Sequence, residues 1–161
     1  MKSMDSRARA VADLPEGRIL ASVDIAASVE RVFRALASKE ITEWWVRPGV
    51  FNTTEWTGDM RTGGRWRAAG IGKGQPYALE GEFLEIDRPR KLVHTWQGVG
   101  RPGPPTTVTY LLEQVDGGTR ITLRHSGFTS RDTCINTCIG WETSFERLAE
   151  FLRPQDSPSN E

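Results

Sequence analysis

Two histidines in this sequence could exchange protons near neutral pH or bind a polar group of a ligand. His94 and His125 each alternate with apolar residues in β-type stretches, about 91 to 97 and 119 to 126. Because side chains alternate between the two faces of a strand, both histidines share a face with core residues. An imidazole in a cavity can bind a ligand or act as a general acid or base. A structural histidine bonded to a backbone carbonyl is the alternative.

Glu142 is the third candidate for acid-base chemistry. It lies within the broader apolar face of a predicted helix, beside Cys138 and Phe145. There the carboxylate could orient a polar ligand group or take a proton. At the edge of the apolar stripe it would instead pair with an arginine or reach solvent. Nothing in the sequence shows that Glu142 converges with the histidines, so catalysis stays open.

The two thiols, Cys134 and Cys138, lie four residues apart. This spacing could supply half of a metal site, but zinc pairs more often come as Cys-x2-Cys in turns. Both cysteines fall on an apolar helical stripe, where a free cysteine packs as a small hydrophobic residue. A disulfide within one helical turn has poor geometry. We therefore predict no metal, no disulfide and no cofactor.

The elements that would position these residues follow from hydrophobic periodicity. Residues 18 to 25 alternate as a strand with one buried face. Ser28 occupies an N-cap position before a helical pattern, and Ile41 with the two following tryptophans fits a second short helix. Six more strands are predicted at about 52–57, 64–69, 77–86, 91–97, 106–115 and 119–126, with Asp116-Gly117-Gly118 as the strongest hairpin signal.

The last predicted element is a long helix from about residue 130 to 153. Its apolar residues recur at spacings of three and four, and Pro154 ends it. One strand, two short helices, six strands and a long helix predict an α+β fold in which an antiparallel sheet wraps around the final helix.

Composition excludes several classes of function. The 161 residues contain 21 Lys plus Arg and 21 Asp plus Glu, so a general nucleic-acid or anionic-membrane binder is disfavoured. No apolar run approaches the roughly 18 residues of a membrane span. Charged residues interrupt the N-terminus, which lacks a secretory pattern, and a cytoplasmic location is expected. We predict a flexible segment over 1–17, one domain over 18–153 and a flexible tail over 154–161.

A set of short motifs resembles a known bacterial family. It comprises Ile25-Ala26-Ala27-Ser28, Val32-Phe33-Arg34-Ala35-Leu36, Trp44-Trp45, Asp59 to Trp66, Gly81 to Asp87, Arg90 to Trp96, Thr119 to Leu123, His125 to Phe128 and Gly140-Trp141. In this order the motifs are similar to bacterial proteins related to the C-terminal domain of the activator of the 90-kDa heat-shock-protein ATPase. That family belongs to the START-like (SRPBCC, polyketide cyclase) superfamily.

The resemblance implies a helix-grip fold, also called START-like or Bet v 1-like. About seven antiparallel strands would curve around the C-terminal helix, often leaving an apolar cavity. The superfamily includes ligand binders, polyketide cyclases and protein-interaction domains, so function must be argued from the site.

The first hypothesis is binding of a small apolar or aromatic molecule between the sheet and the helix. The proposed lining is Trp66, His94, Trp96, Tyr110, His125, Cys138, Glu142 and Phe145. Trp44, Trp45 and Trp141 are assigned to packing of the helices. The segments 70–76 and 98–105 could rim the mouth of the cavity.

Two other hypotheses stay open. One is a cyclase- or hydrolase-type enzyme that uses His94, His125 or Glu142 as acid or base. The other is a protein-interaction module that contacts a chaperone, another protein or a second copy of itself through its surface.

Overall fold

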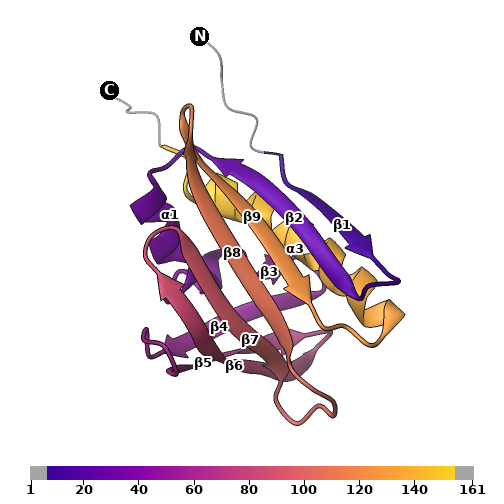
Figure 1. Ribbon diagram of the computed structural model, residues 1–161. Coiled ribbons are helices and arrows are strands. Elements are labelled where there is room, and N and C mark those ends of the chain that lie inside the picture. Colours follow the sequence, from indigo (N-terminus) through magenta and orange to yellow (C-terminus); the bar gives the residue numbers. More distant parts are fainter. Residues whose placement is uncertain (1–6, 155–161) are drawn as a thin grey trace.

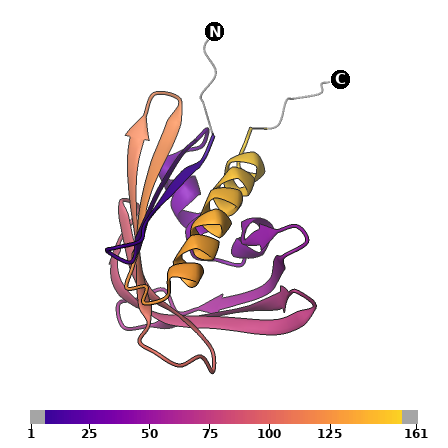
Figure 2. The ribbon, with the colours of Figure 1, turned by 90° about the vertical axis from the view of Figure 1, so that its right-hand side faces the viewer.

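One curved antiparallel sheet forms most of the molecule in the computed structural model, which describes residues 7–154. The strand order is β1-β2-β9-β8-β7-β6-β5-β4-β3, and the sheet curls around the long C-terminal helix (Figures 1 and 2). The strands are β1 Arg9–Asp13, β2 Arg18–Ile25, β3 Val46–Arg47, β4 Phe51–Gly58, β5 Arg65–Gly72, β6 Gln75–Asp87, β7 Lys91–Gly98, β8 Thr106–Val115 and β9 Gly118–Ser126.

Three helices accompany the sheet. Helix α1 (Val29–Leu36) begins after Ser28, whose hydroxyl accepts the Arg31 N–H at 3.2 Å. Helix α2 (Ile41–Trp44) follows closely. Helix α3 (Arg131–Phe151) begins after Ser130, which caps the Thr133 N–H in the same way. None of the helices in residues 7–154 is long and apolar enough to cross a membrane.

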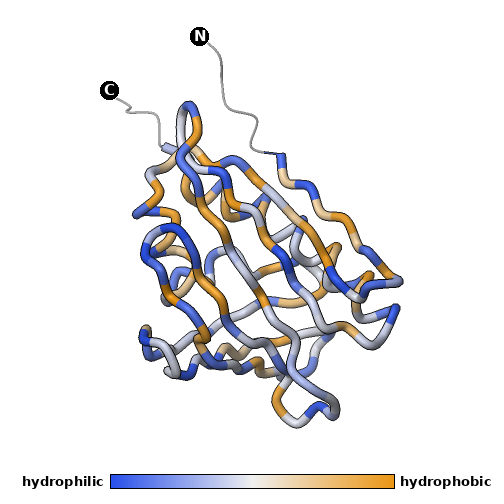
Figure 3. The backbone as a smooth tube through the Cα atoms, in the orientation of Figure 1, coloured by the Kyte–Doolittle hydropathy of each residue, from blue (hydrophilic) through white to orange (hydrophobic). Residues whose placement is uncertain are grey.

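The strands bury alternate residues on the concave face of the sheet. In the middle of β8 and along β9 every second residue is buried, and the residues between the buried ones are half-buried or exposed. The backbone trace shows hydrophobic and hydrophilic residues interspersed along the strands of the sheet (Figure 3). The registers Val108↔His125 and Tyr110↔Leu123 place buried residues opposite one another. The strand faces predicted from the sequence are therefore confirmed.

The predicted helix-grip fold is confirmed, but the sheet has nine strands rather than about seven. Residues 9–13, which we expected within a flexible segment, instead form β1 at the sheet edge, paired with β2. Helix α3 supports it, since the Glu146 and Glu142 carboxylates accept the N–H groups of Ala8 at 3.0 Å and Ala10 at 3.3 Å. Of the predicted flexible ends, 1–6 and 155–161 lie outside the described residues.

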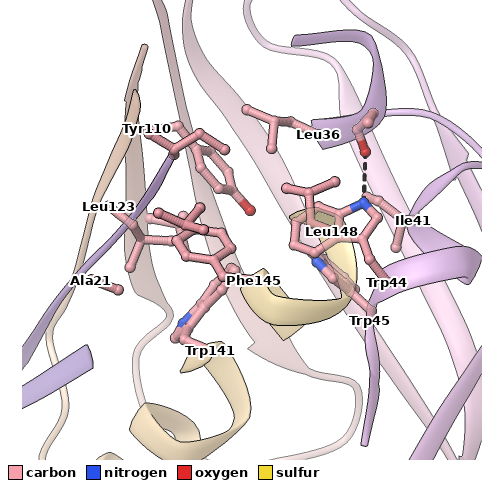
Figure 4. Close-up of a cluster of buried hydrophobic side chains, with 14 of the residues drawn as sticks. Ala21, Leu36, Ile41, Trp44, Trp45, Tyr110, Leu123, Trp141, Phe145 and Leu148 are labelled. Carbon is pink, nitrogen blue, oxygen red and sulfur yellow. Dashed lines mark hydrogen bonds between the residues drawn. The ribbon is translucent and has the colours of Figure 1, made fainter. Parts of the chain in front are cut away.

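A cluster of aromatic side chains fills much of the space between sheet and helix. Trp44 is fully buried, and its indole N–H donates to the Ala35 carbonyl at 2.8 Å (Figure 4). Its ring contacts Phe145 and Trp141 of α3, with centroids 6.1 and 6.5 Å apart. This contact attaches the α1–α2 segment to the C-terminal helix.

Candidate ligand cavity

A cavity of about 940 Å³ lies at the end of the sheet where α3 begins. This volume is within the range of small-molecule sites in proteins. Its lining comes from the first half of α3, the β3–β4 connection, the start of β6, and the end of β7 with the loop that follows. The lining residues include Trp45, Phe51, Tyr77, Leu79, Trp96, Val99, Phe128, Thr137, Gly140, Trp141 and Ser144.

Three tryptophans form one wall of this cavity. The Trp96 ring lies 4.8 Å from Trp45 and 5.5 Å from Trp141, measured between centroids. Trp45 and Trp141 meet edge to face at 6.4 Å. Different parts of the chain supply these residues, since Trp45 directly follows α2, Trp96 belongs to β7 and Trp141 belongs to α3. Trp45 and Trp141 are almost fully buried, whereas Trp96 is half-buried, so Trp96 offers the larger aromatic surface to the cavity.

Hydroxyl and amide groups give the cavity a polar part. The Thr53 and Tyr77 hydroxyls hydrogen-bond to each other, and burial raises the pKa of Tyr77. Gln97 donates its side-chain N–H to the Gly103 carbonyl at 3.0 Å, which ties the β7–β8 loop to the end of β7. The segments 70–76 and 98–105 both contribute lining residues, as their positions between strands led us to expect.

His125 lies behind the tryptophan wall, fully buried in β9. The Trp141 indole N–H can only donate, and it meets Nδ1 of His125 at 3.0 Å. Nδ1 is therefore unprotonated, and the ring proton lies on Nε2, which donates to Oγ1 of Thr106 at 2.7 Å. Thr106 in turn donates to the Trp96 carbonyl at 3.0 Å. Burial and the nearby His94 lower the pKa of His125 to about 3, so it is neutral at pH 7.

His94 has a different set of contacts on β7. Its Nδ1 lies 2.8 Å from the Thr95 carbonyl and must carry the proton, because a carbonyl only accepts. Rings of Trp66, Phe83 and Tyr110 surround it at 5.1 to 6.1 Å. Burial lowers the pKa of His94 to about 4, although the bond to Thr95 opposes this shift. His94 is thus a neutral core residue at physiological pH.

Six of the eight residues predicted to line a ligand site lie in one cluster of contacting rings that also includes Trp141. They are Trp66, His94, Trp96, Tyr110, His125 and Phe145. Of these only Trp96 lines the cavity. The others are buried, and the Tyr110 hydroxyl has no hydrogen-bond partner among residues 7–154. Burial raises the pKa of Tyr110 well above its usual value.

The remaining two predicted residues also lie away from the cavity. Cys138 is buried in the core and does not contribute to the lining. Glu142 is exposed and accepts the Ala10 N–H of β1, so its predicted place in the lining of the ligand site is wrong. A carboxylate at this edge retains its hydration while it supports β1. Residues 7–154 contain no group of three potential metal ligands, and Cys134 and Cys138 are free thiols.

Sequence reasoning missed most of the lining. Trp45 and Trp141 were assigned to packing alone, whereas each both packs and lines the cavity. Phe128 was not considered, although it follows the last strand directly and lies 4.5 Å from the His125 ring. The topology could have indicated Phe128, because the segment that joins β9 to α3 must cross the open end of the space between the sheet and α3.

Comparisons with known proteins agree with this architecture. A family model described as activator of Hsp90 ATPase homolog 1-like protein matches residues 26–153. A search of curated proteins finds no significant match.

Solved bacterial structures share the fold at low sequence identity. Protein Ms6760 from Mycobacterium smegmatis has a TM-score of 0.77 at 22% identity, over 92% of this chain and 98% of that one. The AHSA1 protein from Silicibacter pomeroyi gives 0.70 at 20% identity, over 84% and 97%. CalU16 from Micromonospora echinospora gives 0.63 at 24% identity, over 94% and 88%. With most of its length matched by the family model, the chain belongs to the family of activator of Hsp90 ATPase homolog 1-like proteins.

Proposed function

We propose that the protein binds a small apolar or aromatic molecule in the cavity between the sheet and α3. The observation that carries this proposal is the open cavity of about 940 Å³ walled by Trp45, Trp96 and Trp141. If side chains filled the whole space between the sheet and α3, a protein-interaction role at the surface would be favoured. Here the aromatic cluster fills only the part behind the wall, and the part near the start of α3 stays open. Stacking on the half-buried Trp96 ring and release of water from the apolar lining would supply the affinity.

The geometry favours binding over acid-base catalysis. Both nitrogens of His125 are engaged in hydrogen bonds, and His94 does not line the cavity. Glu142 lies at β1. None of the three residues expected to act as acid or base therefore reaches the space that a substrate would occupy. The chaperone, protein-partner and homodimer hypotheses stay predictions from the sequence.

Gly140 offers a direct test of cavity binding. It lies inside α3 and lines the cavity, and a Cβ built there meets only the Phe51 ring, at 3.8 Å. Gly140→Leu should fill the cavity, whereas Gly140→Ala adds one methyl group and should stabilise the helix by roughly 0.5 to 1 kcal/mol. The alanine variant is therefore the matched control.

The probe is N-phenyl-1-naphthylamine, which is uncharged, aromatic and fluorescent in apolar surroundings. We expect saturable one-to-one binding to the wild type and to Gly140→Ala, and a loss of at least tenfold in affinity for Gly140→Leu. Native mass spectrometry of freshly purified protein should show a co-purifying small molecule that Gly140→Leu lacks. Equal probe binding by all three proteins would refute the proposed site.

A further inference from the structure

Three cationic side chains lie around the cavity. Arg47 comes from β3, Lys73 from the β5–β6 turn and Arg101 from the β7–β8 loop. Arg47 is half-buried, while Lys73 and Arg101 are exposed. Residues far apart in the sequence thus bring positive charge to one opening.

No carboxylate offsets this charge. Among the described residues that line the cavity there is neither Asp nor Glu, and within residues 7–154 none of the three cations forms an ion pair. The whole chain has equal numbers of basic and acidic residues, so the excess is local. A cleft lined by one sign of charge raises the local concentration of ligands of the opposite sign.

The backbone at Lys73 is a further unusual feature. Gly72 pairs with Gln75, which leaves Lys73-Gly74 as a two-residue hairpin loop. Lys73 has φ 51°, the one positive φ of a non-glycine residue between 7 and 154. Asn, Asp or Gly is favoured at this position of such turns. A lysine at this position makes the turn less stable than Asn, Asp or Gly would, and Lys73 lines the cavity.

We propose that the ligand is an aromatic carboxylate, with its ring system against the tryptophan wall and its carboxylate among Arg47, Lys73 and Arg101. This inference rests on the proposed function and adds the charge of the ligand to it. Partly exposed cations suit a carboxylate at the mouth because the anion keeps part of its hydration while it gains charge-assisted hydrogen bonds. The apolar wall on the inner side suits the ring system.

The test compares two probes of the same shape, the anionic naphthalene-2-carboxylate and the uncharged naphthalene-2-carboxamide, by isothermal titration calorimetry. We expect the carboxylate to bind about tenfold more tightly than the amide at low salt, as two or three partly exposed ion pairs would give. The ratio should shrink as ionic strength rises.

Single variants then assign the preference to the three cations. Arg47→Gln, Lys73→Asn and Arg101→Gln should each weaken carboxylate binding about two- to fivefold and weaken amide binding less than carboxylate binding. Arg124→Gln is the control, because Arg124 is exposed on the opposite face of β9. Lys73→Asn should also keep or raise the midpoint of thermal unfolding, which separates lost binding from lost folding.

The outcomes separate the two proposals. Equal binding of acid and amide, or a preference unchanged in all three cation variants, overturns the carboxylate inference and leaves cavity binding intact. Binding of neither naphthalene probe, together with no saturable binding of N-phenyl-1-naphthylamine, overturns both.

Discussion

His125 shows how its neighbours decide the role of a titratable side chain. The Trp141 N–H fixes the tautomer, Thr106 takes the remaining proton, and the Trp96 carbonyl completes the chain of hydrogen bonds. Each polar group in this buried chain is satisfied, as low-dielectric interiors require. His125 therefore holds two residues of the tryptophan wall in place. It binds Trp141 of α3 directly and Trp96 of β7 through Thr106.

Replacing His125 with phenylalanine tests this role. The ring would still fill the space, but the Trp141 N–H would lose its acceptor at a site that is 3% exposed. An unpaired buried donor costs about 1 to 3 kcal/mol, so the free energy of unfolding should fall by that amount. Urea denaturation followed by circular dichroism measures it, with Arg124→Gln as control. A change below about 0.5 kcal/mol, the usual scatter of surface substitutions, would contradict the structural role.

At the scale of elements, β5, β6 and β7 approach closely at one glycine. Gly81 of β6 pairs with Trp66 of β5, and a Cβ there would lie 2.0 Å from the Thr95 carbonyl oxygen and 2.4 Å from Nε1 of Trp66. That carbonyl accepts both the Trp66 indole N–H at 3.1 Å and the His94 Nδ1–H at 2.8 Å. A side chain at position 81 would therefore disturb two rings of the aromatic cluster.

Gly81→Ala should lower the free energy of unfolding by about 1 to 3 kcal/mol, because overpacking forces backbone or ring shifts in a tight core. Chemical denaturation provides the value, and near-ultraviolet circular dichroism should change because Trp66 moves. Gly140→Ala is the matched control, since its Cβ meets ordinary van der Waals contact. If the variant is as stable as the wild type and its aromatic signals are unchanged, then β6 lies less close to Thr95 and Trp66 at residue 81 than these distances indicate.

The sequence predicted the elements whose burial follows a regular period. The strands from residue 18 onward and α3 alternate or repeat clearly, and the predicted bounds differ from the observed ones by a few residues. β1 gave no such signal, because its largest apolar residue, Val11, is 65% exposed and the small Ala10 and Ala12 face the core. The two residues of β3 form a strand only through pairing with β4.

The cavity could be predicted only in part. Strand parity placed His94, Tyr110 and His125 on the concave face, which the structure confirms. Parity does not tell which part of that face stays open. Three tryptophans, one just after α2, one in β7 and one in α3, decide it because they meet between the sheet and α3. Such long-range packing leaves no local pattern in the sequence.

At the scale of the whole molecule, the aromatic cluster buries two neutral histidines in one core. His94 is 4% exposed and His125 is fully buried. Burial holds their pKa values at about 4 and about 3, well below the ordinary value of 6.5. Between about pH 6.5 and pH 4 the two histidines are therefore protonated in the unfolded chain but neutral in the folded protein. The free energy of unfolding falls as the pH falls through this window.

Acid should thus destabilise the whole fold through these two residues. Each histidine contributes a slope of up to about 1.4 kcal/mol per pH unit, so near pH 5 the pair should contribute roughly 2.5 kcal/mol per unit. Urea denaturation at intervals from pH 4.5 to 7.5 gives the slope for the wild type and for a His94→Gln/His125→Gln variant. Carboxylates titrate in both proteins, so the difference between the two slopes isolates the histidines. Parallel curves would mean that the two rings accept protons in the folded state, and that the core around the tryptophan wall admits water.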